Sequence, residues 1–481
     1  MTATVDALSP SIGAMGKAWS VTEPLMGGTE AMRAATVLLP QWPQEEAAAY
    51  KARLETATLF PAFRRTVSVM VGKPFSKALT LGDDVPAQIV GWAEDIDREG
   101  VNLHVFCAEL MGEALAHGLC GVLVEAPKRE DAGAGRVQTR AEQQRAGVRP
   151  YFVRVLHRQI LGYRIASANG ARSLAQLRIA EDATVADGLF GEKTVKRVRV
   201  LTPGAFEVWQ KSERTTAAGA EEWSVIDAGT TGLGYIPFVP FYGWRTGYMT
   251  ARPPLLDLAY LNIKHWQSQS DQDTILHVAR VPILAISGAD DKTSLTIGGS
   301  SAVMLPAGGE IAWVEHSGAA IKAGQESLDA LEEQMIQAGA ELLVKKPGAR
   351  SATESANDAE GNKSDLQRIT EGFEDSLDRA LQMMADYASL GSGGHASLFK
   401  DFGATSLSQA SGQLVLAMKD AGLISGETAL AEMKRRGELA ADVMFDDEQD
   451  KIVEEMPDLD NEDDIAAAMP GEVSAEDDIE S

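Results

Sequence analysis

A helix-forming run from Pro254 to Arg280 carries polar side chains on most of its faces. Its middle, from residue 264 to 273, is polar almost throughout. A helix of a globular protein normally buries one apolar stripe against a core, and this run has no clear stripe of that kind. The sequence therefore predicts a helix that either bridges solvent or packs sideways against copies of itself.

The charge of the chain limits what it binds. Its 481 residues include 44 Lys and Arg against 70 Asp and Glu, a formal net charge of −26. This balance argues against wrapping nucleic acid on a broad basic face and against binding an anionic membrane. Residues 441–481 hold 17 acids and one Lys, a net of −16, which leaves −10 for the rest. We expect a disordered, solvated tail there, with docking to a basic partner as the alternative.

Several protein classes are excluded by what the sequence lacks. Two cysteines rule out a disulfide scaffold and suit a reducing compartment. No stretch approaches the 18 apolar residues that suggest a membrane-spanning helix. The start, Met1 to Asp6, has neither the basic residues nor the apolar block of a secretory signal. We expect a soluble protein that is made in the cytosol.

The first 250 residues predict an α+β domain in which helices precede a mostly antiparallel sheet. The first element is expected to open at Gln41–Glu46, where Pro43 and nearby acids suit a helix start. Helices are predicted over 47–60, 62–71, 85–96 and 103–117, and strands over 120–125, 151–155, 195–201 and 205–209.

The second half predicts fewer strands. An edge strand is expected over 281–288, and a hairpin of 302–306 with 311–315 around residues 307–309. Helices are predicted over 319–344, over 351–388, which would be about 50 Å long, and over 407–437.

The catalytic and nucleotide-binding motifs that we sought are absent from the sequence. It has no G-x-x-x-x-G-K-[ST], no G-x-G-x-x-G after a strand, no H-E-x-x-H and no G-x-S-x-G. We therefore expect no enzyme and no cofactor. If the protein takes part in an energy-driven process, another chain supplies the motor.

One pattern has the spacing of metal ligands, His104-x-x-Cys107 and His117-x-x-Cys120. The two pairs are 13 residues apart on one predicted helix, or about 20 Å, whereas a zinc ion holds all its ligands within about 2.3 Å. We therefore expect no metal site. The cysteines are interpreted as buried apolar residues, and the histidines as surface or hydrogen-bonded ones. A Cys–His nucleophile is not favoured either, because no third group orients it.

Basic residues gather in two places. Arg64 and Arg65 lie within a predicted helix, where a solvated face is the simpler interpretation. Lys345, Lys346 and Arg350 lie on a predicted loop between two helices. They complement the C-terminus of the preceding helix, or several copies of the loop meet and contact a polyanion.

Four stretches of the chain resemble the portal proteins of tailed bacteriophages, in particular a portal family catalogued as a phage domain of unknown function. The likeness covers about residues 40–440, and the third stretch is its most specific part. The stretches are Tyr50 to Phe75, Ala114 to Glu125, Pro254 to Leu284 and Ser351 to Gln367.

The resemblance implies a twelve-subunit ring around a DNA channel at the head vertex of the virion, assembled in the host cytoplasm. The expected parts are a wing (1–250), a first stem helix (251–280), a clip (281–318), a second stem helix (319–344), a channel loop (345–351), a long wing helix (352–399), a crown (400–440) and the acidic tail (441–481).

The resemblance also implies partners. The channel would hold double-stranded DNA without sequence preference, with Lys345, Lys346 and Arg350 as its loop cations. The clip would dock the terminase large subunit and later the head-tail adaptor, and the ring would meet the major capsid protein but no membrane. Two alternatives remain, another virion component such as an adaptor or scaffold, and a soluble α+β enzyme. The expected docking residues of the clip are Ile283, Leu284, Ile286, Leu305 and Trp313.

Overall fold

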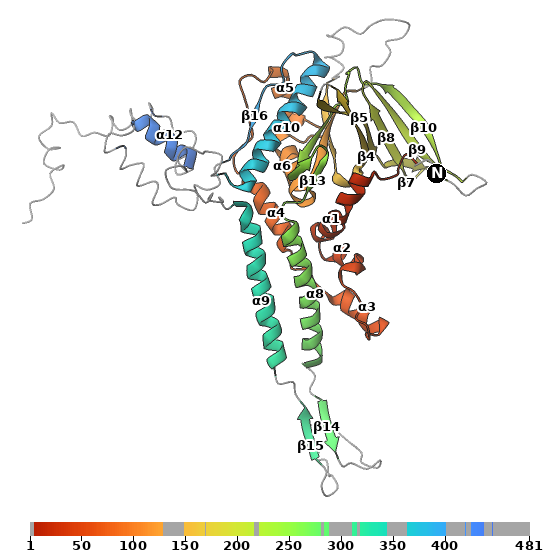
Figure 1. Ribbon diagram of the computed structural model, residues 1–481, viewed down its shortest axis with the longest axis vertical. Coiled ribbons are helices and arrows are strands. Elements are labelled where there is room, and N and C mark those ends of the chain that lie inside the picture. Colours follow the sequence, from red (N-terminus) through yellow and green to blue (C-terminus); the bar gives the residue numbers. More distant parts are fainter. Residues whose placement is uncertain are drawn as a thin grey trace, which may run out of the picture. The chain divides into compact units, whose positions relative to one another are not determined.

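The computed structural model divides the chain into two units, residues 1–400 and 401–481. In the first unit, helices combine with sheets whose paired strands are all antiparallel, which confirms the predicted α+β class (Figure 1). Among the described helices, none is long and apolar enough to cross a membrane. The structure describes residues 4–127, 149–168, 170–215, 221–279, 283–287, 310–314, 318–343, 363–400 and 425–436, with positions 419 and 445.

Helices fill the start of the chain. Two of them, α1 (Pro10–Gly27) and α2 (Thr29–Ala34), precede the expected opening at residue 41, so that prediction is wrong. The helix predicted from residue 47 ends at Thr56 rather than at Phe60, and the next one matches its predicted start. The remaining helices of this region are α3 (Ala47–Thr56), α4 (Ala62–Gly72), α5 (Ala87–Trp92) and α6 (Leu103–His117).

The bounds of α6 agree with the prediction because both of its ends carry strong signals. The Asn102 side chain accepts a hydrogen bond from the Val105 amide and caps the N-terminus. At the other end Gly118 has a φ of 88°, and a Cβ there would meet the Arg252 carbonyl carbon at 2.5 Å. A side chain at position 118 would therefore be strained by both its backbone and its neighbour.

Two sheets follow the helices. The first has the order β11-β2-β3, and the second the order β10-β9-β8-β5-β4. The strands are β2 (Leu119–Glu125), β3 (Tyr151–Val155), β4 (Ile160–Ala168), β5 (Ala171–Ala180), β8 (Arg197–Thr202), β9 (Ala205–Thr215), β10 (Glu221–Thr230) and β11 (Phe238–Tyr242).

Helix α1 packs its Ile12 and Trp19 into the apolar core between the sheets, with Leu119, Leu177 and Phe238.

Three smaller strand pairs accompany the two sheets. The short pairs are β1 (Thr80–Leu81) with β16 (Ala396–Ser397), β6 (Ala183–Asp187) with β7 (Gly191–Val195), and β12 (Trp244–Gly247) with β13 (Thr250–Arg252).

Beyond β13 lie the long helices α8 (Leu256–Ala279) and α9 (Ala319–Ala340), as predicted. Between them in the chain, β14 (Ile283–Ser287) pairs with β15 (Glu310–Val314). A 3-10 turn, η4 (Glu341–Leu343), ends α9. In the second unit the structure describes α12 (Gly426–Arg436), within the expected crown; the acidic tail lies outside the described residues except for Phe445.

The helix α10 (Asp365–Ala388) corrects the start of the helix predicted over 351–388 and agrees with its end. Ser364 is extended, with φ −70° and ψ 158°, and its hydroxyl accepts from the Gln367 amide while the Gln367 side chain accepts from the Ser364 amide. Because this capping box starts a helix, one continuous helix from residue 351 to 388 is wrong. Residues 351–362 lie outside the described part.

Candidate functional site

The helices α8 and α9 lie side by side and form the element with which the chain departs from an ordinary α+β domain (Figure 1). The buried residues of α9 are Leu328, Leu331 and Met335, at helical spacing. A Cβ at Gly324 would meet the side-chain oxygen of Gln272 at 2.0 Å. Gly324 therefore permits the close approach of the two helices, and the Gln272 amide donates to the Ile321 carbonyl at 2.9 Å.

Part of the polar middle of α8 is buried within a single chain, which the sequence did not predict, whereas Lys264 and Asp273 are exposed. Asn262, His265, Ser270 and Gln272 are at most 4% exposed within one chain. Asn262 accepts from the Phe63 amide and donates to the Phe60 carbonyl, both at 2.9 Å, so it satisfies the start of α4. Asn262 and Gln272 bind backbone of other segments, and Leu258, Ile263 and Trp266 are buried as well, so both polar and apolar contacts hold α8.

The same helix leaves some polar atoms unpaired. The Trp266 Nε1 and the Ser270 Oγ are buried and have no hydrogen-bond partner within the described residues. His265 Nε2 lies 3.4 Å from the Glu332 carboxylate of α9, close enough for an ion pair when His265 is protonated. Such pairing carries a desolvation cost that an apolar contact would not.

The hairpin between the two helices pairs differently from the prediction. Strand 310–314 was expected to pair with 302–306, but its partner is 283–287, with Leu284 opposite Trp313 and Ile286 opposite Ile311. The pairing brings four of the five predicted clip residues onto one ribbon, although their side chains lie outside the described part of the structure. Residues 301–309, which include Leu305, also lie outside it.

The predicted channel loop falls in a gap of the described residues. The description stops after η4 at Leu343 and resumes at residue 363, so Lys345, Lys346 and Arg350 lie outside it. The other basic pair, Arg64 and Arg65, is exposed on α4, which confirms the solvated face expected for it.

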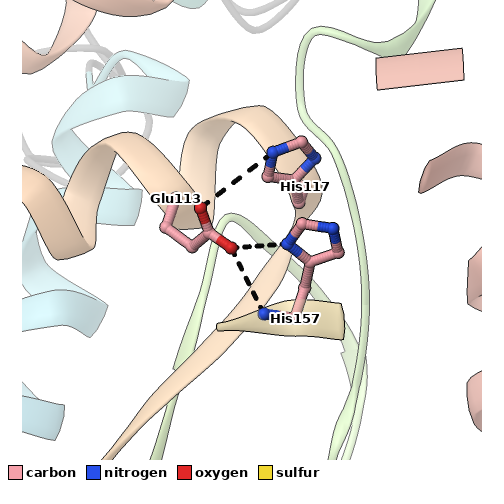
Figure 2. A group of neighbouring side chains, drawn as sticks. All are labelled: Glu113, His117 and His157. Atoms are coloured by element: carbon pink, nitrogen blue, oxygen red, sulfur yellow. Dashed lines mark hydrogen bonds and ion pairs between the residues drawn. The ribbon is translucent and has the colours of Figure 1, made fainter. Parts of the chain in front are cut away.

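A second group of polar side chains lies inside the body, where Glu113, His117 and His157 meet (Figure 2). Glu113 and His117 come from successive turns of α6, and His157 begins the 3-10 turn η3 (His157–Gln159). The Glu113 carboxylate lies 2.5 Å from His157 Nδ1 and accepts from the His157 amide at 3.2 Å. His157 Nε2 lies 2.7 Å from Glu23 of α1.

The geometry of this cluster does not suit a metal ion. The rings of His117 and His157 stack with centroids 3.9 Å apart and planes 25° from parallel. A metal lies about 2.0–2.1 Å from each ligating nitrogen and in the plane of its ring, so stacked rings cannot both direct lone pairs at one ion. Each nitrogen of His157 already faces a carboxylate, and His117 Nδ1 is 2.8 Å from the Thr22 hydroxyl.

The cluster is therefore a hydrogen-bonded network that joins α1, α6 and η3. Burial and the neighbouring His157 charge lower the pKa of His117 to about 4, so this ring is neutral near pH 7. Burial acts to raise the pKa of Glu113, but the hydrogen bond to His157 and its charge outweigh that effect and lower it. Trp19 adds a further tie by donating to the His117 carbonyl at 2.8 Å.

The sequence interpretation of the His and Cys pairs is confirmed in part. Cys107 and Cys120 are buried and free, and burial raises the pKa of both thiols, so neither is primed as a nucleophile. His104 is half-buried and accepts from the Leu79 amide at 3.2 Å. The Glu113–His117 spacing was a usable signal for the network, whereas nothing in the sequence connects either residue to His157.

Comparison with known proteins gives one family match and several distant structures. A family model described as a domain of unknown function (DUF4055) matches residues 254–388, which contain α8, the hairpin, α9 and α10. This is well under half of the chain. No curated protein matches it.

Three solved structures are similar over most of the chain but at low identity. The structure titled "Neck of empty GTA particle computed with C6 symmetry" is 15% identical, with a TM-score of 0.42, and the match covers 78% of this chain and 90% of that one. "Neck of native GTA particle computed with C12 symmetry" is 14% identical, with a TM-score of 0.39, and the match covers 77% of this chain and 89% of that one. "Virion of native gene transfer agent (GTA) particle" is 13% identical, with a TM-score of 0.38, and the match covers 78% of this chain and 89% of that one. Because these values are low, the function must be argued from the residues of this chain.

Proposed function

We propose that this protein is a portal subunit of a tailed-phage-like particle, a non-enzymatic virion component that forms a ring for the passage of DNA. The observation that carries the proposal is the unit α8–β14–β15–α9. Two long helices pack together in it, and the two strands that separate them in the sequence pair with each other. The α+β body holds this unit through hydrogen bonds of Asn262 to Phe60 and Phe63 and of Gln267 to Leu38. The resemblance of four stretches to portal proteins supports the same interpretation.

In this proposal each part has a task. The body (residues 1–250) is the wing, which faces the major capsid protein, and α8 and α9 are the stem around the channel. The hairpin within 281–318 is the clip, which docks the terminase large subunit and later the head-tail adaptor. The ring has twelve copies and resides at the head vertex of the virion.

Charge explains how such a channel would let DNA slide. The exposed residues of α9 include Glu326, Asp329 and Glu333 against Lys322. Each phosphate that a cation neutralises adds affinity, so a basic wall would hold DNA, whereas an acidic wall repels it. The loop cations Lys345, Lys346 and Arg350 would then provide the transient grip.

Electron microscopy of the purified full-length chain tests the ring directly. We expect negative-stain images of rings with a central hole, and a mass in solution of about twelve chains. A monomer with a substrate cleft would overturn the proposal and would favour the alternative of an α+β enzyme.

The loop cations are tested in a packaging assay with K345A/K346A/R350A. We expect rings to assemble normally and DNA retention to fall by at least severalfold, because three contacts per subunit are removed. The matched control is K17A/K51A/R172A, which removes the same charge from exposed positions of the body. Unaltered retention in the loop variant would remove the grip from the proposal.

The clip is tested by a paired substitution in its ribbon. Leu284 and Trp313 are opposite each other in the β14–β15 register. We expect L284D/W313A to keep the ring and to lose capture of the terminase large subunit. Capture at the level of the unchanged chain would exclude this ribbon as the docking surface.

A further inference from the structure

The tip of the β6–β7 hairpin presents two large apolar side chains to solvent. Leu189 is 86% and Phe190 is 94% exposed. Two glycines shape the tip: Gly188 has a φ of 77°, and a Cβ at Gly191 would meet the Asp187 carbonyl oxygen at 2.4 Å. The turn therefore holds the two side chains outward instead of folding them onto the ribbon. Adjacent exposed apolar side chains of this size mark an interaction site.

The hairpin is a firm support for that tip. It continues the β5–β8 ladder, because Ala180 pairs with Val198 and the Glu181 amide donates to the Arg197 carbonyl at 2.9 Å. At its base the Arg199 guanidinium binds both carboxylate oxygens of Glu181, at 2.8 and 2.9 Å. A two-pronged contact of this kind fixes direction as well as distance.

A cavity of about 230 Å³ lies between α10 and β12. Tyr242, Trp244 and Ile369 give it apolar walls, and most of its lining surface is apolar. Its volume suits one aromatic side chain. In Figure 1, α10 and β7 lie well apart with β4 and β5 between them, so the tip of the hairpin does not reach the cavity of its own chain.

The charges around the tip and the cavity are complementary. Asp187 and Glu192 flank the tip and are exposed, and with Lys193 next to Glu192 the excess there is one negative charge. The cavity is bordered by the guanidinium groups of Arg245, Arg368 and Arg379. It also includes Asp365, which lies 3.5 Å from Arg368, and Asp375, so the excess there is one positive charge. Opposite charges at the rim of an apolar contact favour one partner and one orientation.

We propose that the β6–β7 tip of one copy inserts Phe190 into the α10–β12 cavity of the next copy, with Asp187 and Glu192 facing the cavity arginines. The contact joins two different surfaces, so it is heterologous and repeats from copy to copy. Its closure into a ring rests on the proposed function. A second copy is the favoured occupant because one chain carries both the apolar tip and a cavity matched to it in size and charge.

A disulfide trap tests the contact in the full-length protein. Gly372 lines the cavity, and a Cβ there would have no atom within 4 Å, so G372C is accommodated. The native Cys107 and Cys120 are buried and do not interfere. We expect oxidised F190C/G372C to give a ladder of covalent multimers. The controls are F190C alone and F190C/V37C, because Val37 is 80% exposed and lies outside the cavity; neither should give more than a dimer.

Charge exchange and truncation give an independent readout. We expect L189S/F190S to raise the concentration needed for half assembly at least tenfold, and its fold should survive because both side chains are exposed. E192R should weaken assembly, and R379E should restore it in the combined variant. Wild-type rings without a ladder, or rings unaffected by L189S/F190S, would overturn this contact and leave the portal proposal intact. If L189S/F190S kept its rings but no longer captured the major capsid protein, the tip would bind that protein and not the next copy, which would also overturn the contact. A monomeric wild type would overturn the proposed function itself.

Discussion

Two helices of the same length are held in this protein by different forces. Both α8 and α10 have 24 residues. Helix α10 buries Leu366, Phe373 and Leu377 on one apolar face, whereas α8 buries Asn262, His265 and Gln272 beside its apolar residues. The position of α10 follows from removing apolar surface from water, whereas that of α8 also depends on the hydrogen bonds that Asn262 and Gln272 make to other segments.

The two helices differ in how far each can shift before it loses the contacts that hold it. Apolar packing has little directional preference, so a helix such as α10 can shift slightly and keep most of its stabilisation. A buried amide must meet its partners within a narrow range of distance and angle, and it is costly when it does not. Helix α8 is therefore fixed in one register against α4 and α9, which is consistent with its proposed role as a stem helix.

The largest effect is expected from the apolar side of the comparison. Phe373 is 1% exposed and packs against Phe241, with ring centroids 4.7 Å apart. F373A should lower the free energy of unfolding by about 3–5 kcal/mol, measured by urea denaturation. The control I336A removes a side chain that is 71% exposed on α9 and should change it by less than about 0.5 kcal/mol. A loss below about 1 kcal/mol for F373A would show that α10 is not held by its apolar face.

Buried polar groups add a dependence on pH that apolar packing lacks. Because the pKa of His117 is about 4 in the fold and 6.5 as its ordinary value, the unfolded chain binds the extra proton first as the pH falls. Stability present above pH 6.5 should be lost progressively down to pH 4, on the order of 3 kcal/mol. The lowered pKa of Glu113 acts in the same direction, its share being lost as the pH falls below 4.5.

The charged groups that act on His117 are Glu113 on its own helix and His157 and Arg158 on η3, and Glu23 of α1 faces His157. H117F keeps the ring stack but cannot titrate, so its unfolding free energy should fall less between pH 7 and pH 4. V105A, at an exposed position of the same helix that carries no titratable group, serves as the control and should keep the wild-type pH profile. Equal pH dependence in H117F and in the unchanged chain would assign the effect to other groups.

An intermediate effect is expected from the polar side of the comparison. N262A removes the acceptor of the Phe63 amide and one of the two donors to the Phe60 carbonyl, so it leaves the Phe63 amide unpaired while the Phe60 carbonyl keeps the Ala62 amide. It should cost about 1–3 kcal/mol and speed hydrogen exchange of the Phe63 amide. Q269A changes a more exposed amide of the same helix and should have little effect. Unchanged exchange at Phe63 would mean that the Asn262 contacts do not fix α8.

The contrast also explains how much of the fold could be predicted from the sequence. Helices with clear ends, such as α6, and the C-terminal end of α10 were predicted closely. The burial of the α8 polar residues was not, because their partners, Phe60 and Ile321 among them, are distant in sequence or belong to other elements. Of the candidate sites, the Glu113–His117 spacing was present in the sequence but was not used for a prediction, and nothing in the sequence indicated the cavity beside α10.

The smallest effect concerns the start of α10, where the sequence held an unused signal. Ser364 and Gln367 have the spacing of a capping box, and each side chain bonds the backbone of the other. S364A should cost about 1 kcal/mol and increase hydrogen exchange in the first turn only, since the apolar face of the helix is untouched. Q367A should lower the free energy of unfolding by more than S364A does, because the Gln367 amide also donates to the Lys400 carbonyl at 2.7 Å. The double variant should lose less unfolding free energy than the sum of the two single losses, since either change disrupts the same pair. Strict additivity would contradict reciprocal capping and would reopen the question of where this helix begins.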